Sequence, residues 1–161
     1  MLEGKCKVAV FVSGGGTNLQ AILDSRGKII KNADICLVAS NNKDAYALER
    51  AKKHDIETFI IEDEQRLVEK LKSLKIDFIV LAGYLRILSE DFCKLYSNRM
   101  INVHPSLIPS FCGKGFYGLK VHEKALEYGV KVSGATVHFV NEIPDGGKII
   151  DQRAVRVHEG D

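Results

Sequence analysis

Residues 6–18 read CKVAVFVSGGGTN, and this stretch predicts how the fold begins. Its first seven residues are apolar except for Lys7, which is typical of a strand buried on both faces of a sheet. Three glycines follow at 14–16, where the chain can turn tightly because no side chain is in the way. Apolar residues then recur at helical spacing from Leu19 to Leu23. The stretch therefore predicts a strand, a turn and a helix, the repeating unit of an α/β sheet.

The same alternation of strand and helix continues through most of the chain. Further strands are predicted at 35–40, 57–61, 78–81 and 100–103, and the helices between them begin after Asp44, Asp63 and Ser89. A helix at 119–128 is followed by two long β-rich runs, 132–140 and 148–157. The short segment between these runs cannot hold a crossover helix, so they should pair as an antiparallel hairpin. We predict an α/β fold: a mostly parallel sheet with helices on both faces and a C-terminal antiparallel extension.

Composition excludes several classes of protein. The chain has 161 residues, of which 45% are apolar and 27% charged, as in a single soluble domain. The net charge of +2 is spread along the sequence and gives no basis for a nucleic-acid-binding surface. No apolar run is long enough to span a membrane, and residues 1–5 lack the apolar core of a signal peptide. These features predict a cytoplasmic protein without membrane or nucleic-acid partners.

The cysteines and histidines do not form a metal-binding pattern. None of the cysteines (Cys6, Cys36, Cys93 and Cys112) is close to another in sequence, and the five histidines lack ligand spacing. The sequence therefore predicts free thiols in a reducing compartment and no bound metal.

Candidate catalytic residues stand at the end of the strand predicted at 100–103. Asn102 and His104 are two residues apart, so they project from the same face of an extended chain, and Pro105 ends the ladder. Ligands of open α/β sheets bind at such strand ends. An amide donor can meet a developing oxyanion and an imidazole can move protons near neutral pH, so the pair suits attack on a carbonyl. The alternative is a strand end at which His104 is only hydrogen-bonded.

Asp145 is a candidate for a third group that orients His104. It lies in the sequence DGG, at 145–147, between the two C-terminal β-rich runs. A carboxylate there would keep the imidazole protonated as charge develops on an attacked carbonyl. Asp-Gly is also a strong turn signal, so Asp145 could serve turn chemistry alone. His138, on the preceding run, could support the site from behind, act in catalysis or pack in the core.

The glycine-rich turn is a candidate anion site. It opens a helix, where backbone N–H groups attract anions, and Thr17 and Asn18 add side-chain donors. The motif is not a P-loop, and Leu19 stands where a dinucleotide fingerprint needs its third glycine. We therefore favour a single phosphate ester, held at Gly16, Thr17 and Asn18, over a dinucleotide. The alternative is a tight turn without a ligand.

Several segments together resemble the phosphoribosylglycinamide formyltransferases, the folate-dependent enzymes of purine synthesis. The matching segments run in order through almost the whole length: SGGGTNLQ at 13–20, AGYLRIL at 82–88, NVHPSLIP at 102–109, GATVHFV at 134–140 and DGG at 145–147. The resemblance implies a Rossmann-like formyltransferase fold with Asn102, His104 and Asp145 as the catalytic residues. It also implies that a folate is held by Leu85, Arg86, Ile87, Leu88, Val140, Asn141 and Asp145, and the substrate phosphate by Gly16, Thr17 and Asn18.

The implied reaction moves a formyl group from the co-substrate 10-formyltetrahydrofolate to the amine of glycinamide ribonucleotide. The resemblance implies one formyltransferase domain over 1–161, with a phosphate-binding half at about 1–100 and a folate and catalytic half at about 101–161. Chains of this family normally continue with further helices, and we expect these helices to be missing from the sequence of residues 1–161. Two alternatives stay open: a formyltetrahydrofolate deformylase, which uses water as the acceptor, and a phosphate- or folate-binding module without catalysis. The sequence makes no prediction of oligomeric state.

Overall fold

The computed structural model describes residues 4–161, which form two compact units. One unit comprises the chain up to Arg86, and the other runs from Ile87 to Asp161. Residues 1–3 lie outside the described part. The prediction that residues 1–5 are not part of a signal peptide therefore falls partly outside it as well.

The first unit is built on a parallel sheet. Its strands are β1 (Cys6–Val12), β2 (Ala33–Ser40), β3 (Glu57–Ile60) and β4 (Phe78–Leu81). They lie in the order β3-β2-β1-β4, and every neighbouring pair is parallel. The order reverses after β3, so the chain passes to the other side of β1 before forming β4. The predicted parallel sheet is confirmed.

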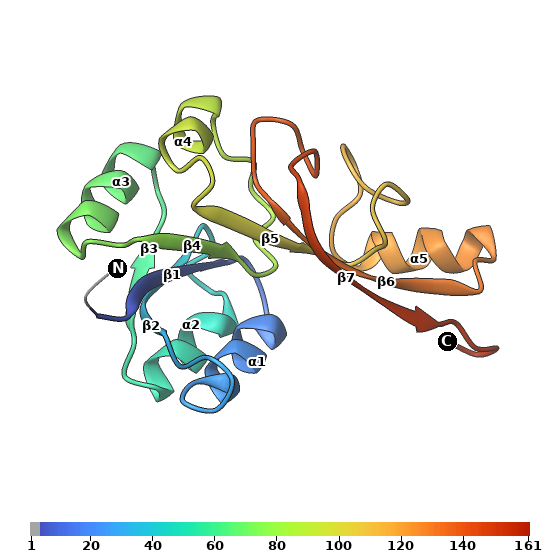
Figure 1. Ribbon diagram of the computed structural model, residues 1–161, viewed down its shortest axis with the longest axis horizontal. Coiled ribbons are helices and arrows are strands. Elements are labelled where there is room, and N and C mark those ends of the chain that lie inside the picture. The colour runs from blue at the N-terminus through green and yellow to red at the C-terminus, as the bar shows by residue number, and fades with distance from the viewer. Residues whose placement is uncertain (1–3) are drawn as a thin grey trace. The chain divides into compact units, whose positions relative to one another are not determined.

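Helices cover both faces of this sheet (Figure 1). Helices α1 (Thr17–Ser25) and α2 (Tyr46–Lys53) lie on one face, and α3 (Glu64–Ser73) lies on the other. Right-handed crossovers require this arrangement, because the connections that contain α1 and α2 step along the sheet in one direction and the connection through α3 returns. Successive side chains of β1 point to opposite faces of the sheet. Those on one face, Val8 and Val10 among them, pack against α1 and α2 in one buried cluster.

One of the predicted helix starts is wrong. Asp63 caps α3 as predicted, since its side chain accepts a hydrogen bond from the Arg66 N–H. Asp44 was predicted to cap α2, but the N-cap is Ala45 and no side chain caps this end. The side chain of Asn42 accepts the Asp44 N–H at 3.0 Å. This local turn places Asp44 before the helix rather than at its first turn.

The second unit contains a short helix, a three-stranded sheet and a longer helix. These are α4 (Glu90–Leu95), β5 (Met100–His104), α5 (Leu119–Tyr128), β6 (Val132–Phe139) and β7 (Ile149–Arg156). As predicted, Ser89 caps α4 by accepting the Phe92 N–H. Strands β6 and β7 pair antiparallel, which confirms the predicted hairpin and antiparallel extension.

The pairing of β5 with β6 positions the candidate catalytic residues. The two strands run antiparallel, with Asn102 opposite His138 and His104 opposite Thr136. Residues directly opposite on neighbouring strands point to the same face. His104 is the last residue of β5, whereas the predicted strand ended one residue earlier. The register of the sheet places Thr136 beside it on the same face.

Candidate functional site

His104 is buried, with 4% of its side chain exposed, and both of its ring nitrogens face acceptors. Nε2 lies 2.8 Å from the Phe111 carbonyl oxygen, and Nδ1 lies 3.5 Å from Asp145 Oδ2. A carbonyl oxygen can only accept, so Nε2 must carry a proton. His104 thus lies between a backbone carbonyl and a carboxylate, both of which are hydrogen-bond acceptors.

Asp145 stands between two histidines. Its Oδ1 lies 3.5 Å from His138 Nε2, its Oδ2 faces His104, and the Gly113 N–H donates to Oδ2 at 2.9 Å. Burial by itself raises the pKa of this carboxyl. The contact with His138, the Gly113 hydrogen bond and the charges of the two histidines outweigh burial, so the pKa lies below its ordinary value. Asp145 is thus an anion at neutral pH. Its φ of 54° also makes it a turn residue, so the two readings of Asp145 are compatible.

His138 links Asp145 to Asn102. Its Nδ1 lies 2.8 Å from the Phe139 carbonyl oxygen and therefore carries a proton. Its Nε2 lies 3.3 Å from Asn102 Nδ2 and 3.5 Å from Asp145 Oδ1. His138 is buried like His104, with 2% of its side chain exposed.

Charge on Asp145 should make stability depend on pH. The folded-state pKa lies below the reference value of 3.8, so this contribution is fully present above 3.8 and is lost as the pH falls through the folded-state pKa. We expect the difference in unfolding free energy between the wild type and Asp145→Asn to be largest near neutral pH. It should shrink as the pH falls below about 4. Urea denaturation at pH 7, 5, 4 and 3 measures it, and a difference that grew towards low pH would contradict the assignment.

A second layer of polar side chains holds the segment after β5. Thr136 Oγ1 donates to the Ser106 carbonyl at 2.7 Å and accepts the Ile108 N–H at 3.1 Å. Ser106 Oγ donates to the Ser110 carbonyl at 2.6 Å. These bonds bring the Phe111 carbonyl back to His104. The roles of Thr136, Ser106 and Phe111 were not predicted from the sequence. The position of His104 and Ser106 on either side of Pro105 could have indicated a role for Ser106.

The glycine loop of the first unit has the backbone of an anion site. Gly16 is the N-cap of α1 with φ of +76°, and no side chain caps the helix. The first-turn N–H groups of Thr17 and Asn18 therefore lack acceptors within the helix, and both residues are exposed. A Cβ on Gly16 would lie 2.6 Å from Ala47 Cβ, so only glycine fits here. The predicted phosphate-binding residues thus lie together at one helix end.

The residues predicted to hold a folate fall in both units. Leu85 and Arg86 end the first unit, and Ile87 and Leu88 begin the second. The Leu85 N–H donates to Ser13 Oγ at 2.9 Å, and the Leu85 side chain is exposed. In the second unit, the Val140 N–H donates to the Met100 carbonyl, and Asn141 Oδ1 accepts the Ile143 N–H.

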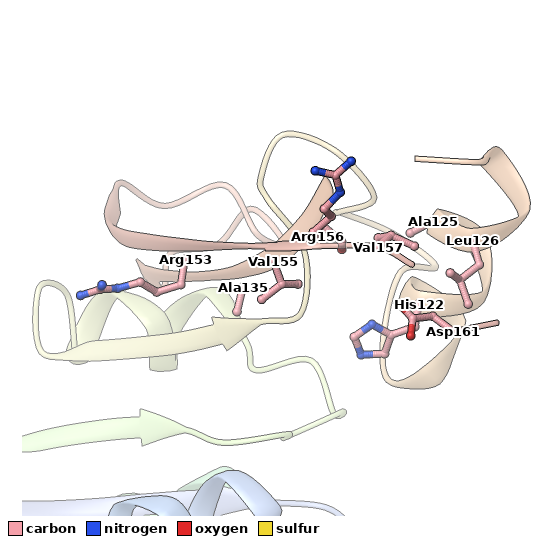
Figure 2. A pocket seen from close by; sticks show the side chains of 11 residues that line it. His122, Ala125, Leu126, Ala135, Arg153, Val155, Arg156, Val157 and Asp161 are labelled. Atoms are coloured by element: carbon pink, nitrogen blue, oxygen red, sulfur yellow. The ribbon is translucent and has the colours of Figure 1, made fainter. Parts of the chain in front are cut away.

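A groove elsewhere in the second unit contains none of the predicted site residues. It has a volume of about 540 Å³ and lies along α5, β6 and β7, where Ala125, Leu126 and Val155 form part of its wall. Figure 2 shows the side chains of Arg153 and Arg156 pointing in different directions from β7. The groove shares no lining residue with the cluster around Asp145.

Within residues 4–161, no helix is long and apolar enough to cross a membrane. The same part of the chain contains no group of three or more histidine, cysteine or acidic side chains arranged to hold a metal ion.

Comparison with known proteins places the chain. The profile of the family described as "Formyl transferase" matches residues 6–161. A phosphoribosylglycinamide formyltransferase of Haemophilus influenzae is 40% identical over 96% of this chain and 75% of its own length. The chloroplastic phosphoribosylglycinamide formyltransferase of Arabidopsis thaliana is also 40% identical, over 96% of this chain and 56% of its own length. The chain thus spans little more than half of the chloroplastic relative.

Solved structures share the fold. A phosphoribosylglycinamide formyltransferase from Anaplasma phagocytophilum has a TM-score of 0.89 and 36% identity, over 96% of this chain and 74% of its own. A formyltetrahydrofolate deformylase from Pseudomonas syringae has a TM-score of 0.85 and 30% identity, over 99% of this chain and 54% of its own. The predicted formyltransferase fold is confirmed. With its profile match over residues 6–161, the chain belongs to the formyl transferase family.

Proposed function

We propose that the protein transfers a formyl group from 10-formyltetrahydrofolate to the amine of glycinamide ribonucleotide, a step of purine synthesis. The observation that carries the proposal is the partly buried Asp145 carboxylate, which lies 3.5 Å from both His104 and His138. An anion between two imidazoles, with the Asn102 amide beside one of them, suits acyl transfer. The names of the relatives at 40% identity supply the acceptor, phosphoribosylglycinamide, and the transferred formyl group.

In the proposed reaction the neutral amine attacks the formyl carbon, and negative charge develops on the formyl oxygen. The Asn102 amide group and a protonated His104 stabilise that oxygen. For His104 to do so, its Nε2 proton must leave the Phe111 carbonyl, which lies 2.8 Å from Nε2. Phe111 lies in the segment that follows β5, so the proposed reaction requires this segment to move when the substrate binds.

Asp145 acts on protons in this proposal. The attacking nitrogen becomes positively charged when the bond to the formyl carbon forms, and it must lose a proton before the folate nitrogen leaves. Asp145, an anion with a lowered pKa, attracts that proton and keeps His104 charged. Its low pKa makes it a weak base, so its larger effect is electrostatic, and the proton passes through water to the folate nitrogen, which leaves as an N–H group.

The remaining predicted residues bind the substrates in this proposal. The phosphate of glycinamide ribonucleotide binds at Gly16, Thr17 and Asn18, where first-turn N–H groups and exposed side chains supply donors. The folate binds along the segments 85–88 and 140–145. The exposed side chains of Leu85 and Ile87 suit a flat aromatic ring.

Two other functions fit the same cluster. A deformylase would use water in place of the amine, and a solved deformylase shares the fold at 30% identity. A binding module would hold the ligands without turnover. The glycine loop favours the transferase, because a phosphate site matters only when the acceptor carries a phosphate.

One assay separates the three functions. The protein is mixed with 10-formyltetrahydrofolate in the presence and absence of glycinamide ribonucleotide, and the loss of the formyl group is followed by absorbance. Transferase activity predicts turnover only when the acceptor is present. Equal turnover without the acceptor would identify a deformylase, and binding of both ligands without turnover would identify a module.

The phosphate site makes a separate prediction. Asn18→Ala removes an exposed donor at the start of α1. A hydrogen bond to a charged group is worth enough that its loss should raise the KM for glycinamide ribonucleotide by about 10- to 100-fold. The KM for formylfolate should stay within about twofold of wild type, because folate is held by other residues. Steady-state kinetics with each substrate varied in turn measures both, and equal increases in the two KM values would indicate damage to the first unit as a whole.

A further inference from the structure

Three successive peptide groups of the glycine loop are fixed through their carbonyl oxygens. The Gly14 carbonyl accepts the Ala47 N–H at 3.0 Å, and the Gly16 carbonyl accepts the Gln20 N–H at 2.9 Å. The Gly15 carbonyl, between them, accepts Arg50 Nε at 2.7 Å. Two of the three donors are backbone groups, and the third is a side chain of α2.

Fixing a carbonyl also fixes the next N–H group. In a planar trans peptide, the oxygen of one residue and the N–H of the next point in opposite directions. The bond from Arg50 to the Gly15 carbonyl therefore sets where the Gly16 N–H points. Glycine has no side chain to restrict rotation of this peptide, so without that bond it could turn its carbonyl outwards. An outward carbonyl would present a partial negative charge to an anion.

Arg50 is itself held in place from several sides. Its Nη1 donates to Gln20 Oε1 at 3.1 Å, and its guanidinium lies 5.0 Å from the centre of the Tyr46 ring. Its Cδ lies 3.3 Å from the place that a Cβ on Gly16 would occupy. A guanidinium can donate to two acceptors in fixed directions, which a single ammonium cannot do.

We propose that Arg50 is a positioning residue for the phosphate-binding loop: through the Gly15 carbonyl it holds the Gly16 N–H towards the anion. The inference rests on the proposed function, because it assumes that the loop binds the phosphate of the acceptor. Arg50 acts through the backbone in this role and does not replace Thr17 or Asn18 as a ligand.

Three variants test the proposal. Arg50→Met keeps most of the aliphatic stem but removes the donors, and Arg50→Lys keeps the charge but replaces the rigid guanidinium fork with an ammonium on a flexible stem, so it holds the two acceptors less firmly. Lys53→Met is the matched control. Lys53 lies on the same helix with its Nζ 5.7 Å from the centre of the same Tyr46 ring, and it is exposed. The Lys53→Met variant removes one positive charge, as Arg50→Met does, but leaves the donors to the glycine loop in place.

The readouts are titration with inorganic phosphate, followed by the amide NMR signals of Gly16, Thr17 and Asn18, and steady-state kinetics with both substrates. Arg50→Met should weaken phosphate binding and raise the KM for glycinamide ribonucleotide, each by about tenfold or more. Arg50→Lys should give an intermediate loss, and Lys53→Met should remain within about twofold of wild type. The kcat and the KM for formylfolate should change little in all three.

The outcomes separate this inference from the proposed function. If phosphate shifts none of these signals in the wild type, the phosphate site fails and the inference falls with it. If the wild type responds and Arg50→Met binds phosphate as tightly as Lys53→Met, Arg50 does not position the loop, while the proposed function stands. A loss of melting temperature and of affinity for both substrates in Arg50→Met would show a purely structural role and would also overturn the inference.

Discussion

Asp145→Asn is expected to lower turnover by about two to four orders of magnitude while the protein stays folded. Asparagine has nearly the same shape, tolerates the positive φ of this position and can still accept the Gly113 N–H. What it lacks is the negative charge that faces His104 and His138 at 3.5 Å. Without that charge, the electrostatic support that Asp145 gives to His104 in the proposed reaction is lost. The kcat for formyl transfer, measured beside a melting curve, shows the effect.

Matched variants show whether the loss belongs to this site. Asp151→Asn changes an exposed carboxylate on β7 and should leave kcat within about twofold of wild type. His104→Ala should lower kcat as far as Asp145→Asn, and the double variant should lose little more, because the two residues act as one unit. Near-normal turnover in Asp145→Asn would leave Asp145 with turn chemistry alone.

The strands and helices were predictable because their signals are local. The apolar run from Cys6 to Val12 and the capping residue Asp63 define the elements that the structure contains. The prediction for Asp44 was wrong for a reason that a linear pattern does not reveal: Asn42, two residues earlier, accepts the Asp44 N–H in a local turn, and Ala45 is the N-cap. The pairing of Asn102 with His138 depends on the register of β5 and β6, which the sequence leaves open.

The contacts that complete the cluster were beyond the sequence because they use the backbone. The Phe111 carbonyl faces His104, and the Gly113 N–H binds Asp145. Every residue has such groups, so no residue type indicates which of them will be used. Arg50 was missed for a related reason: its partner is the Gly15 carbonyl, 35 residues away in sequence. Side-chain chemistry predicted the three candidate residues, and the fold supplied their partners.

Gly147, the last residue of the Asp-Gly-Gly turn at 145–147, connects this turn to the site. A Cβ on Gly147 would lie 1.6 Å from the Phe139 carbonyl oxygen, which is far inside van der Waals contact with a backbone atom. That oxygen is also the acceptor for His138 Nδ1, at 2.8 Å. A side chain at Gly147 must therefore move the end of β6 or the turn that carries Asp145. Either shift changes the geometry of the histidines around the carboxylate.

Gly147→Ala is expected to destabilise the protein by about 1–3 kcal/mol, as overpacking against a fixed backbone does. It should also lower kcat by about 100-fold, because displacement of a catalytic group by roughly 1 Å has that effect. Gly146→Ala is the graded comparison: the nearest atoms there are Cγ2 and Cβ of Ile143, at 2.6 and 2.7 Å, so the overlap is less severe than at Gly147 and does not involve β6. Its losses should be clearly smaller in both measurements. Urea denaturation and steady-state kinetics on the two variants decide the matter, and a Gly147→Ala enzyme with wild-type kcat would show that Asp145 tolerates movement of its turn.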